Sequence, residues 1–135
     1  MRIGYAVGDA ELINSLNTVK DSFNSYTVNV ITQNCAGIAF LEWDYYLDKA
    51  RKIINVRDNF SVFLDNNNWK VLPSKANFVF TSPPGCSGSE AYNIFRENGV
   101  LVRHFGNPGI ENWLRISIGT EDDMKRVMEI IKTEF

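Results

Sequence analysis

The chain has 135 residues, of which 44% are hydrophobic, 22% charged and 13% aromatic. This composition is typical of an ordinary globular protein with a core of moderate size. The formal net charge is −2, so no basic field attracts nucleic acid or an anionic membrane surface. No stretch approaches the roughly 20 apolar residues of a membrane-spanning helix. We therefore expect neither nucleic acid nor a membrane as a partner.

The first half of the chain predicts a short strand followed by helices. Residues 2–7 read as a strand, and Gly8 or Asp9 is placed to cap a helix. The apolar residues of that helix recur on one side, at Leu12, Ile13, Leu16, Val19 and Phe23. Thr32 is then expected to begin one long helix over residues 31–66, of the kind that often connects two lobes.

The second half predicts the order β-β-α-β-β-α. We expect strands over residues 69–72, 76–81, 100–103 and 113–118, with helices over 90–98 and from Thr120 onward. Gly99 is a candidate left-handed helix end, and Thr120 is a candidate helix cap. This mixture favours an α+β fold, with a small antiparallel or mixed sheet packed against helices.

Arg115 is the first candidate binding residue. It alternates along its predicted strand with Leu114, Ile116 and Ile118, so it lies on the face opposite the core. A planar guanidinium at such a position suits a carboxylate or a phosphate. The alternative is a structural ion pair with Glu111 or Glu121.

Arg103 is the second candidate, 12 residues earlier in the sequence. A turn between the two segments can return the chain as an antiparallel partner, which would bring the two arginines together. Two facing cations repel each other unless an anion lies between them. We therefore expect a small, doubly anionic ligand.

No complete catalytic set or metal site is visible in the sequence. His104 is the only histidine and has no nucleophile context, so we expect it to be solvated or structural. Asn77 lies among apolar residues and is interpreted as a buried amide that orients a loop or contacts a ligand. The pair Cys35 and Cys86 lacks metal-type spacing and fits buried, inert thiols in a reducing cytoplasm.

Four segments together resemble the C-terminal part of the fold-type-I pyridoxal-phosphate aminotransferases, and most closely the histidinol-phosphate aminotransferase branch. They are MRIGYAVGDAELINSLNTVKDSFN, VLPSKANFVF, ENGVLVRHFG and WLRISIGTEDDMKRVMEII. The resemblance implies that Arg2 binds the phosphate of the cofactor. It also implies that Arg115 binds the α-carboxylate of the substrate and that Arg103 contacts the substrate's phosphate.

The resemblance further implies pyridoxal 5'-phosphate as the cofactor, a homodimer, and a role in histidine biosynthesis. It assigns residues 1–30 to a large cofactor-binding domain, residues 31–66 to a connecting helix and residues 67–135 to a small C-terminal domain. The lysine that binds the cofactor is expected upstream of Met1. We therefore expect this chain to be a fragment that is inactive alone.

Two other functions remain open at this point. One is decarboxylation of a phosphorylated amino acid on the same framework, because relatives of this branch use similar arginines. The other is a non-enzymatic α+β module that binds anions or a protein partner.

Overall fold

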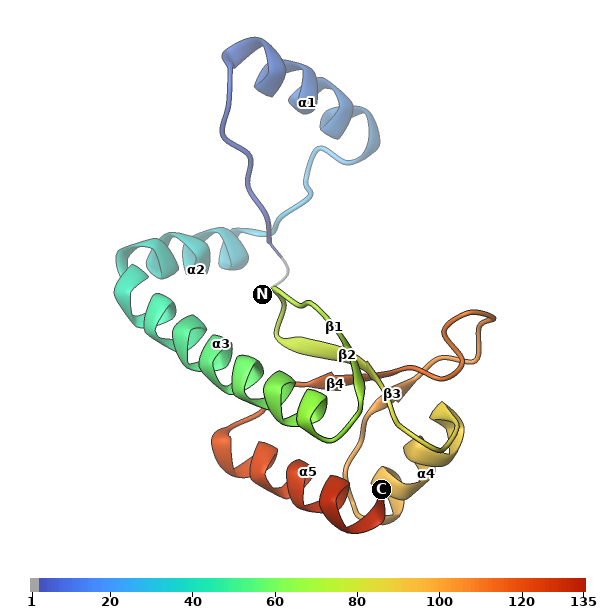
Figure 1. Cartoon of the computed structure of the whole chain (residues 1–135). Helices are drawn as coiled ribbons and strands as arrows, with labels where there is room; N and C mark the ends of the chain where they lie inside the picture. The colour runs from blue at the N-terminus through green and yellow to red at the C-terminus, as the bar shows by residue number, and fades with distance from the viewer. Residues whose placement is uncertain (1–2) are drawn as a thin grey trace. The chain divides into compact units, whose positions relative to one another are not determined.

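The computed structural model describes residues 3–135, which divide into two compact units. One unit extends to Leu47 and contains the helices α1 (Ala10–Phe23) and α2 (Val30–Leu41). The other covers Asp48–Phe135 and contains the whole sheet (Figure 1). The helix α3 (Trp43–Asn66) begins in the first unit and continues into the second.

Helix α1 forms where its apolar periodicity predicts it. The side chain of Asp9 caps it by accepting a hydrogen bond from the backbone N–H of Glu11 at 2.8 Å. None of its residues is buried, and Phe23 is 90% exposed. The strand expected over residues 2–7 is wrong for residues 3–7, because an isolated extended segment has no neighbouring strand to bond. Arg2 lies outside the described residues.

The expected single helix over residues 31–66 is wrong, because the structure has two helices there. Helix α2 ends at Leu41 and α3 begins at Trp43, with Glu42 between them at φ −96° and ψ 32°. Asn29, and not Thr32, caps α2: its side chain accepts from the Thr32 N–H at 2.8 Å. The break has no proline or glycine at Glu42 to mark it, so apolar spacing alone did not reveal it.

The described residues form one four-stranded antiparallel sheet in the order β1-β2-β4-β3. Its strands are β1 (Lys70–Leu72), β2 (Phe78–Ser82), β3 (Arg103–His104) and β4 (Leu114–Ser117). Helix α4 (Gly88–Glu97) follows β2, and helix α5 (Glu121–Glu134) follows β4. The predicted α+β class and the element order of the second half are confirmed.

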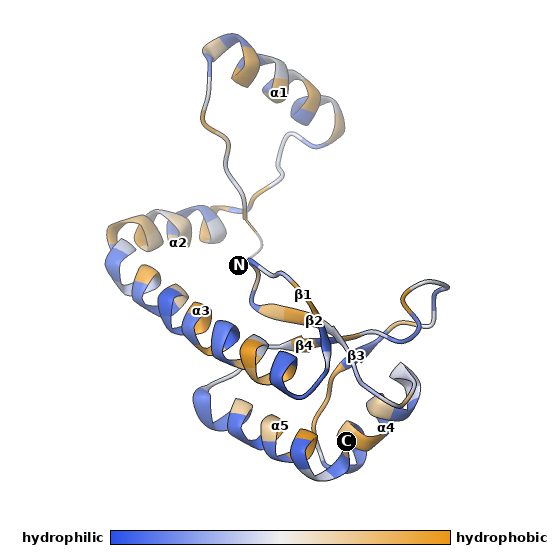
Figure 2. Ribbon diagram, in the orientation of Figure 1, coloured by the Kyte–Doolittle hydropathy of each residue, from blue (hydrophilic) through white to orange (hydrophobic). Residues whose placement is uncertain are grey.

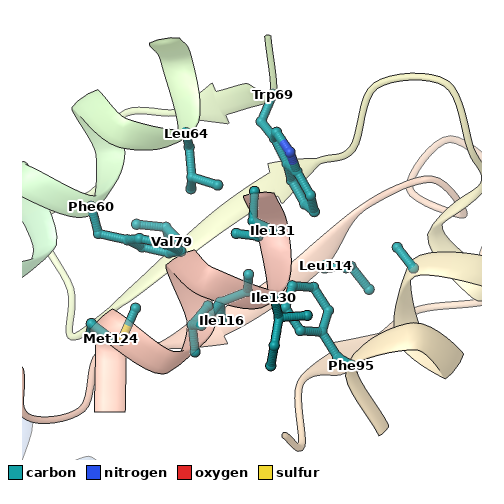
Figure 3. Packing of buried hydrophobic residues seen from close by; sticks show 12 residues of the cluster. Phe60, Leu64, Trp69, Val79, Phe95, Leu114, Ile116, Met124, Ile130 and Ile131 are labelled. Carbon is teal, nitrogen blue, oxygen red and sulfur yellow. The ribbon is translucent and has the colours of Figure 1, made fainter. Parts of the chain in front are cut away.

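One face of the sheet is covered by helices and forms the core (Figure 3). Helix α5 contributes an apolar stripe against a polar outer side, and Figure 2 shows this alternation along the helix. The buried hydrophobic residues come from α3, α4, α5, the strands and the segment before β1: Phe60, Leu64, Trp69, Val79, Ala91, Phe95, Leu114, Ile116, Met124, Val127, Ile130 and Ile131. This core fixes the sheet and leaves its other face uncovered in the described chain.

Two capping boxes begin the helices of the second unit. The Ser87 hydroxyl accepts from the Glu90 N–H while the Glu90 carboxylate accepts from the Ser87 N–H, and Thr120 and Asp123 do the same for α5. Hydrogen bonds from Ser87 and Thr120 stabilise the ionised carboxylates of Glu90 and Asp123, and so hold the pKa of each carboxyl group below its usual value. The predicted cap at Thr120 is confirmed.

The chain reverses after α4 at Gly99, whose φ of +74° confirms the predicted left-handed helix end. Gly88, at the start of α4, lies against the backbone before β4. A Cβ atom at Gly88 would lie 2.6 Å from the carbonyl oxygen of Glu111. Among the described residues, no helix is both long and apolar enough to cross a membrane.

Candidate anion-binding face of the sheet

Strand β4 separates its side chains between the core and the open face of the sheet. Leu114 and Ile116 are buried, whereas Arg115 and Ser117 are exposed. This pattern follows from the two-residue period of a strand. The sequence prediction that Arg115 lies on the face opposite the core is therefore confirmed.

The strand register brings the two arginines into one row. Phe80 of β2 pairs with Arg115 of β4, and Arg115 pairs directly with Arg103 of β3. Leu72 of β1 pairs with Phe80 and completes the row across the sheet. Directly opposed residues of like charge on neighbouring strands are destabilising. A bound anion relieves this repulsion, so the row favours an anionic ligand.

Neither arginine makes an ion pair with an acidic residue within residues 3–135. The structural pairing of Arg115 with Glu111 or Glu121 is thus absent from this structure. Each guanidinium instead lies over an aromatic ring: Arg115 over Phe78 at 5.4 Å and Arg103 over Phe105 at 5.5 Å, measured from Cζ to the ring centroid. A ring face attracts the cation without neutralising it. Both charges remain able to bind a carboxylate or phosphate.

Aromatic side chains pack against one another beside the two arginines. The ring of Phe80 stacks on Trp113, with centroids 5.1 Å apart and planes inclined by 18°. Phe105 meets Phe80 edge-on at 5.8 Å. Phe105, the ring beneath Arg103, therefore belongs to this aromatic cluster.

His104 does not join the two arginines. It pairs with Leu114 of β4, so it lies on the core side of the sheet, and its ring nitrogen Nε2 lies 2.7 Å from the carbonyl oxygen of Glu111. Its ring also packs near that of Tyr92, with centroids 6.3 Å apart. Of the two expected roles, solvated or structural, these contacts favour the structural one.

Arg57 is a buried cation that the sequence interpretation missed. It is 4% exposed, and its Nη1 donates to the carbonyl oxygen of Ala76 at 3.1 Å. Its Nε and Nη2 donate to the carboxylate of Asp58 at 2.9 and 2.8 Å. Arg57 precedes the buried Phe60 and Leu64 by three and seven residues, so it lies on the same face of α3 as these core residues. The helical spacing that identifies the core could therefore have identified Arg57 as buried.

The segment held by Arg57 leads directly into β2. Asn77 follows Ala76, and its backbone carbonyl accepts from the N–H of Ile118 at 2.9 Å. The side chain of Asn77 is exposed, so the expectation of a buried amide is wrong. Apolar neighbours suggested burial, but at the edge of the strand the backbone and not the amide makes the contact.

The cysteines and acidic residues do not form a second site in the described part of the chain. Cys35 and Cys86 are free and half-buried, and burial raises the pKa of the Cys86 thiol. Residues 3–135 contain no group of three or more His, Cys, Asp or Glu side chains that could hold a metal ion. The open face with Arg103 and Arg115 is thus the candidate site.

The chain belongs to the family of class I and II aminotransferases, whose sequence model matches residues 1–131. It is 46% identical over 135 residues to a histidinol-phosphate aminotransferase of Syntrophus aciditrophicus (strain SB), covering all of this chain and 37% of that protein. It is 43% identical over 132 residues to a histidinol-phosphate aminotransferase of Clostridium acetobutylicum, covering 98% of this chain and 38% of that protein.

A solved structure supports the fold. The chain superposes on the crystal structure of the histidinol-phosphate aminotransferase from Clostridium acetobutylicum with a TM-score of 0.73 and 20% identity, covering 84% of this chain and 35% of that one. The chain thus spans little more than a third of the length of the relatives that it matches.

Proposed function

We propose that this chain is the C-terminal part of a pyridoxal-phosphate-dependent aminotransferase of the histidinol-phosphate aminotransferase kind. The intact protein transfers an amino group between an amino acid or amino phosphate and a 2-oxo acid. Identity of 46% along the whole chain to a protein of that name supports this proposal. A homodimer and a cytoplasmic location belong to the same proposal and derive from the family resemblance.

The observation that carries the proposal is the pair of opposed arginines, which have no acidic partner among residues 3–135. Arg115 is assigned to the α-carboxylate of the amino acid, and Arg103 to the phosphate or second carboxylate of the substrate. Hydrogen bonds to charged groups contribute about 1.5–3 kcal/mol each. Both arginines project from strands anchored by the core, so the substrate is oriented by a rigid part of the fold.

The division of the chain into domains rests on the same family resemblance. We propose that residues 1–30 belong to a large domain, residues 31–66 connect two domains, and residues 67–135 form the small domain. All four strands of the described chain lie between Lys70 and Ser117, which supports the last of these assignments.

The cofactor is expected to bind mainly to polypeptide other than the described residues. The row that carries both arginines also contains Leu72 and Phe80, so its charged groups are two guanidinium groups that suit an anionic substrate group. When bound, pyridoxal phosphate supplies an electron sink for the bonds at the substrate's α-carbon. Arg2 is proposed to contact its phosphate. We assign the described residues to binding and orientation alone.

Anion binding by the 135-residue chain tests the site. Glutarate is titrated into the wild type, Arg115→Ala and Arg103→Ala, and binding is followed by NMR of the arginine Nε–H groups. We expect each substitution to weaken glutarate binding about tenfold or more. Lys132→Ala removes a surface cation from α5 and serves as the control. Glutarate binding that is equal in all four proteins would remove both arginines from the site.

Product analysis tests the reaction class in the full-length protein. We expect conversion of a 2-oxo acid into an amino acid, with no release of carbon dioxide from an amino-acid phosphate. Carbon dioxide as the main product would establish the decarboxylase alternative. The 135-residue chain alone is expected to show no turnover, and turnover by this chain would contradict its assignment as one part of the catalytic unit.

A further inference from the structure

The two rings beneath the arginines lie toward opposite ends of the strands. Phe78, under Arg115, faces Ser117, which lies two residues beyond Arg115 along β4. Phe105, under Arg103, lies two residues beyond Arg103 in the direction of β3. Because β3 and β4 are antiparallel, these two displacements point in opposite directions.

We propose that Phe78 and Phe105 are positioning residues that hold the guanidinium groups of Arg115 and Arg103 apart. The Cα atoms of the two arginines are direct neighbours across the strands, yet each charged group leans away from the other onto its own ring. The face then binds a ligand with two separate anionic groups, in place of one compact dianion between the cations. This differs from the single bridging anion that the sequence suggested.

The position of Phe78 is itself fixed by the helix behind the sheet. Arg57 holds the carbonyl of Ala76, and the carbonyl of the next residue, Asn77, accepts from Ile118. Phe78 follows immediately as the first residue of β2. The backbone is therefore anchored by α3 and by the chain that follows β4, up to the residue that supports Arg115. Phe105 is fixed differently, by its edge contact with Phe80.

The first test needs no ligand, so it does not depend on the proposed function. Protons above an aromatic ring are shifted upfield in NMR spectra. We expect the Nε–H and Cδ–H signals of Arg115 to lose this shift in Phe78→Leu and to retain it in Phe78→Tyr. Phe105→Leu is expected to remove the upfield shift from the signals of Arg103. If the arginine signals are unchanged in both leucine variants, the rings do not position the arginines.

A matched control is available on the other side of the unit. Lys132 lies over the ring of Phe63 at 5.6 Å, the same type of contact at nearly the same distance. Phe63→Leu should alter the signals of Lys132 and leave those of Arg115 and Arg103 unchanged. Amide spectra of all variants show whether the sheet is intact. If Phe78→Leu or Phe105→Leu shifts the amide signals throughout the sheet and moves both arginines together, the change is a general disturbance, which would contradict a local positioning role.

The second test asks whether the cations act separately. Inorganic phosphate carries one compact anionic group, and glutarate carries two carboxylates. If the guanidinium groups are held apart, Arg115→Ala leaves the phosphate-induced shift of Arg103 in place but weakens glutarate binding. Loss of the phosphate effect at Arg103 in this variant would show a shared anion and overturn the proposal.

The rings of Phe78 and Phe105 should also contribute to the affinity for glutarate. Cation–π contacts at exposed sites correspond to about a two- to fivefold effect on binding. We expect Phe78→Leu to weaken glutarate binding by that factor and Phe78→Tyr to restore it, with Phe63→Leu equal to the wild type. Failure of both ligands to bind the wild-type chain would count against the proposed function here, while the ligand-free spectra would still decide the role of the rings.

Discussion

Replacing Gly88 by alanine tests the contact that joins α4 to the segment before β4. The added Cβ atom would lie 2.6 Å from the carbonyl oxygen of Glu111, 2.9 Å from the carbonyl carbon of Asn112 and 3.0 Å from its Cα. All three are backbone atoms, so no flexible side chain can move aside. The overlap must be relieved by moving the helix or the segment that leads into β4.

Two opposing effects determine how much Gly88→Ala changes the free energy of unfolding. Overpacking of this kind costs about 1–3 kcal/mol. Alanine recovers up to about 1 kcal/mol relative to glycine in a helix, and less in its first turn. We therefore expect Gly88→Ala to lower the free energy of unfolding by about 1–2 kcal/mol.

Urea unfolding followed by the NMR amide signals of β2 and α5 measures this change in the second unit. Gly106→Ala is the matched control, because a Cβ there meets nothing within 4 Å and Gly106 does not have a positive φ. It should change the stability by less than about 0.5 kcal/mol. Equal stabilities of the two variants would refute the steric argument.

Three further changes test other contacts. Arg57→Ala leaves the Ala76 carbonyl without its charged donor and should cost about 2–3 kcal/mol in urea unfolding, whereas a loss below about 0.5 kcal/mol would assign Arg57 no anchoring role. Ile131→Ala in the core should cost about 2–5 kcal/mol by the same measurement. Because the pKa of Asp123 is lowered in the folded protein, its contribution to stability is present above the usual carboxyl range and disappears as the pH falls through and below it. Asp123→Asn should therefore weaken the acid dependence of unfolding, and an unchanged pH profile would contradict this.

Local signals in the sequence predicted the helix ends that depend on neighbouring residues. Asp9 and Thr120 cap their helices as expected, because an N-cap needs only a side-chain acceptor within three residues of a free N–H. The end of α2 at Leu41 was not predicted. No proline or glycine at Glu42 marks this break in the sequence.

The sequence by itself determined that Arg115 is exposed beside a buried strand face, because alternation along one strand requires no knowledge of its neighbours. The sequence also suggested that Arg103 lies on an antiparallel neighbour. Only the tertiary structure decided that the register places Arg103 directly opposite Arg115, that Phe78 lies beneath Arg115 and that Arg57 is buried. Strand register and ring contacts join residues far apart in the sequence, and a shift of one residue would place these side chains on the other face. The sequence therefore predicted that the two arginines meet, and the sheet decided their register and the rings beneath them.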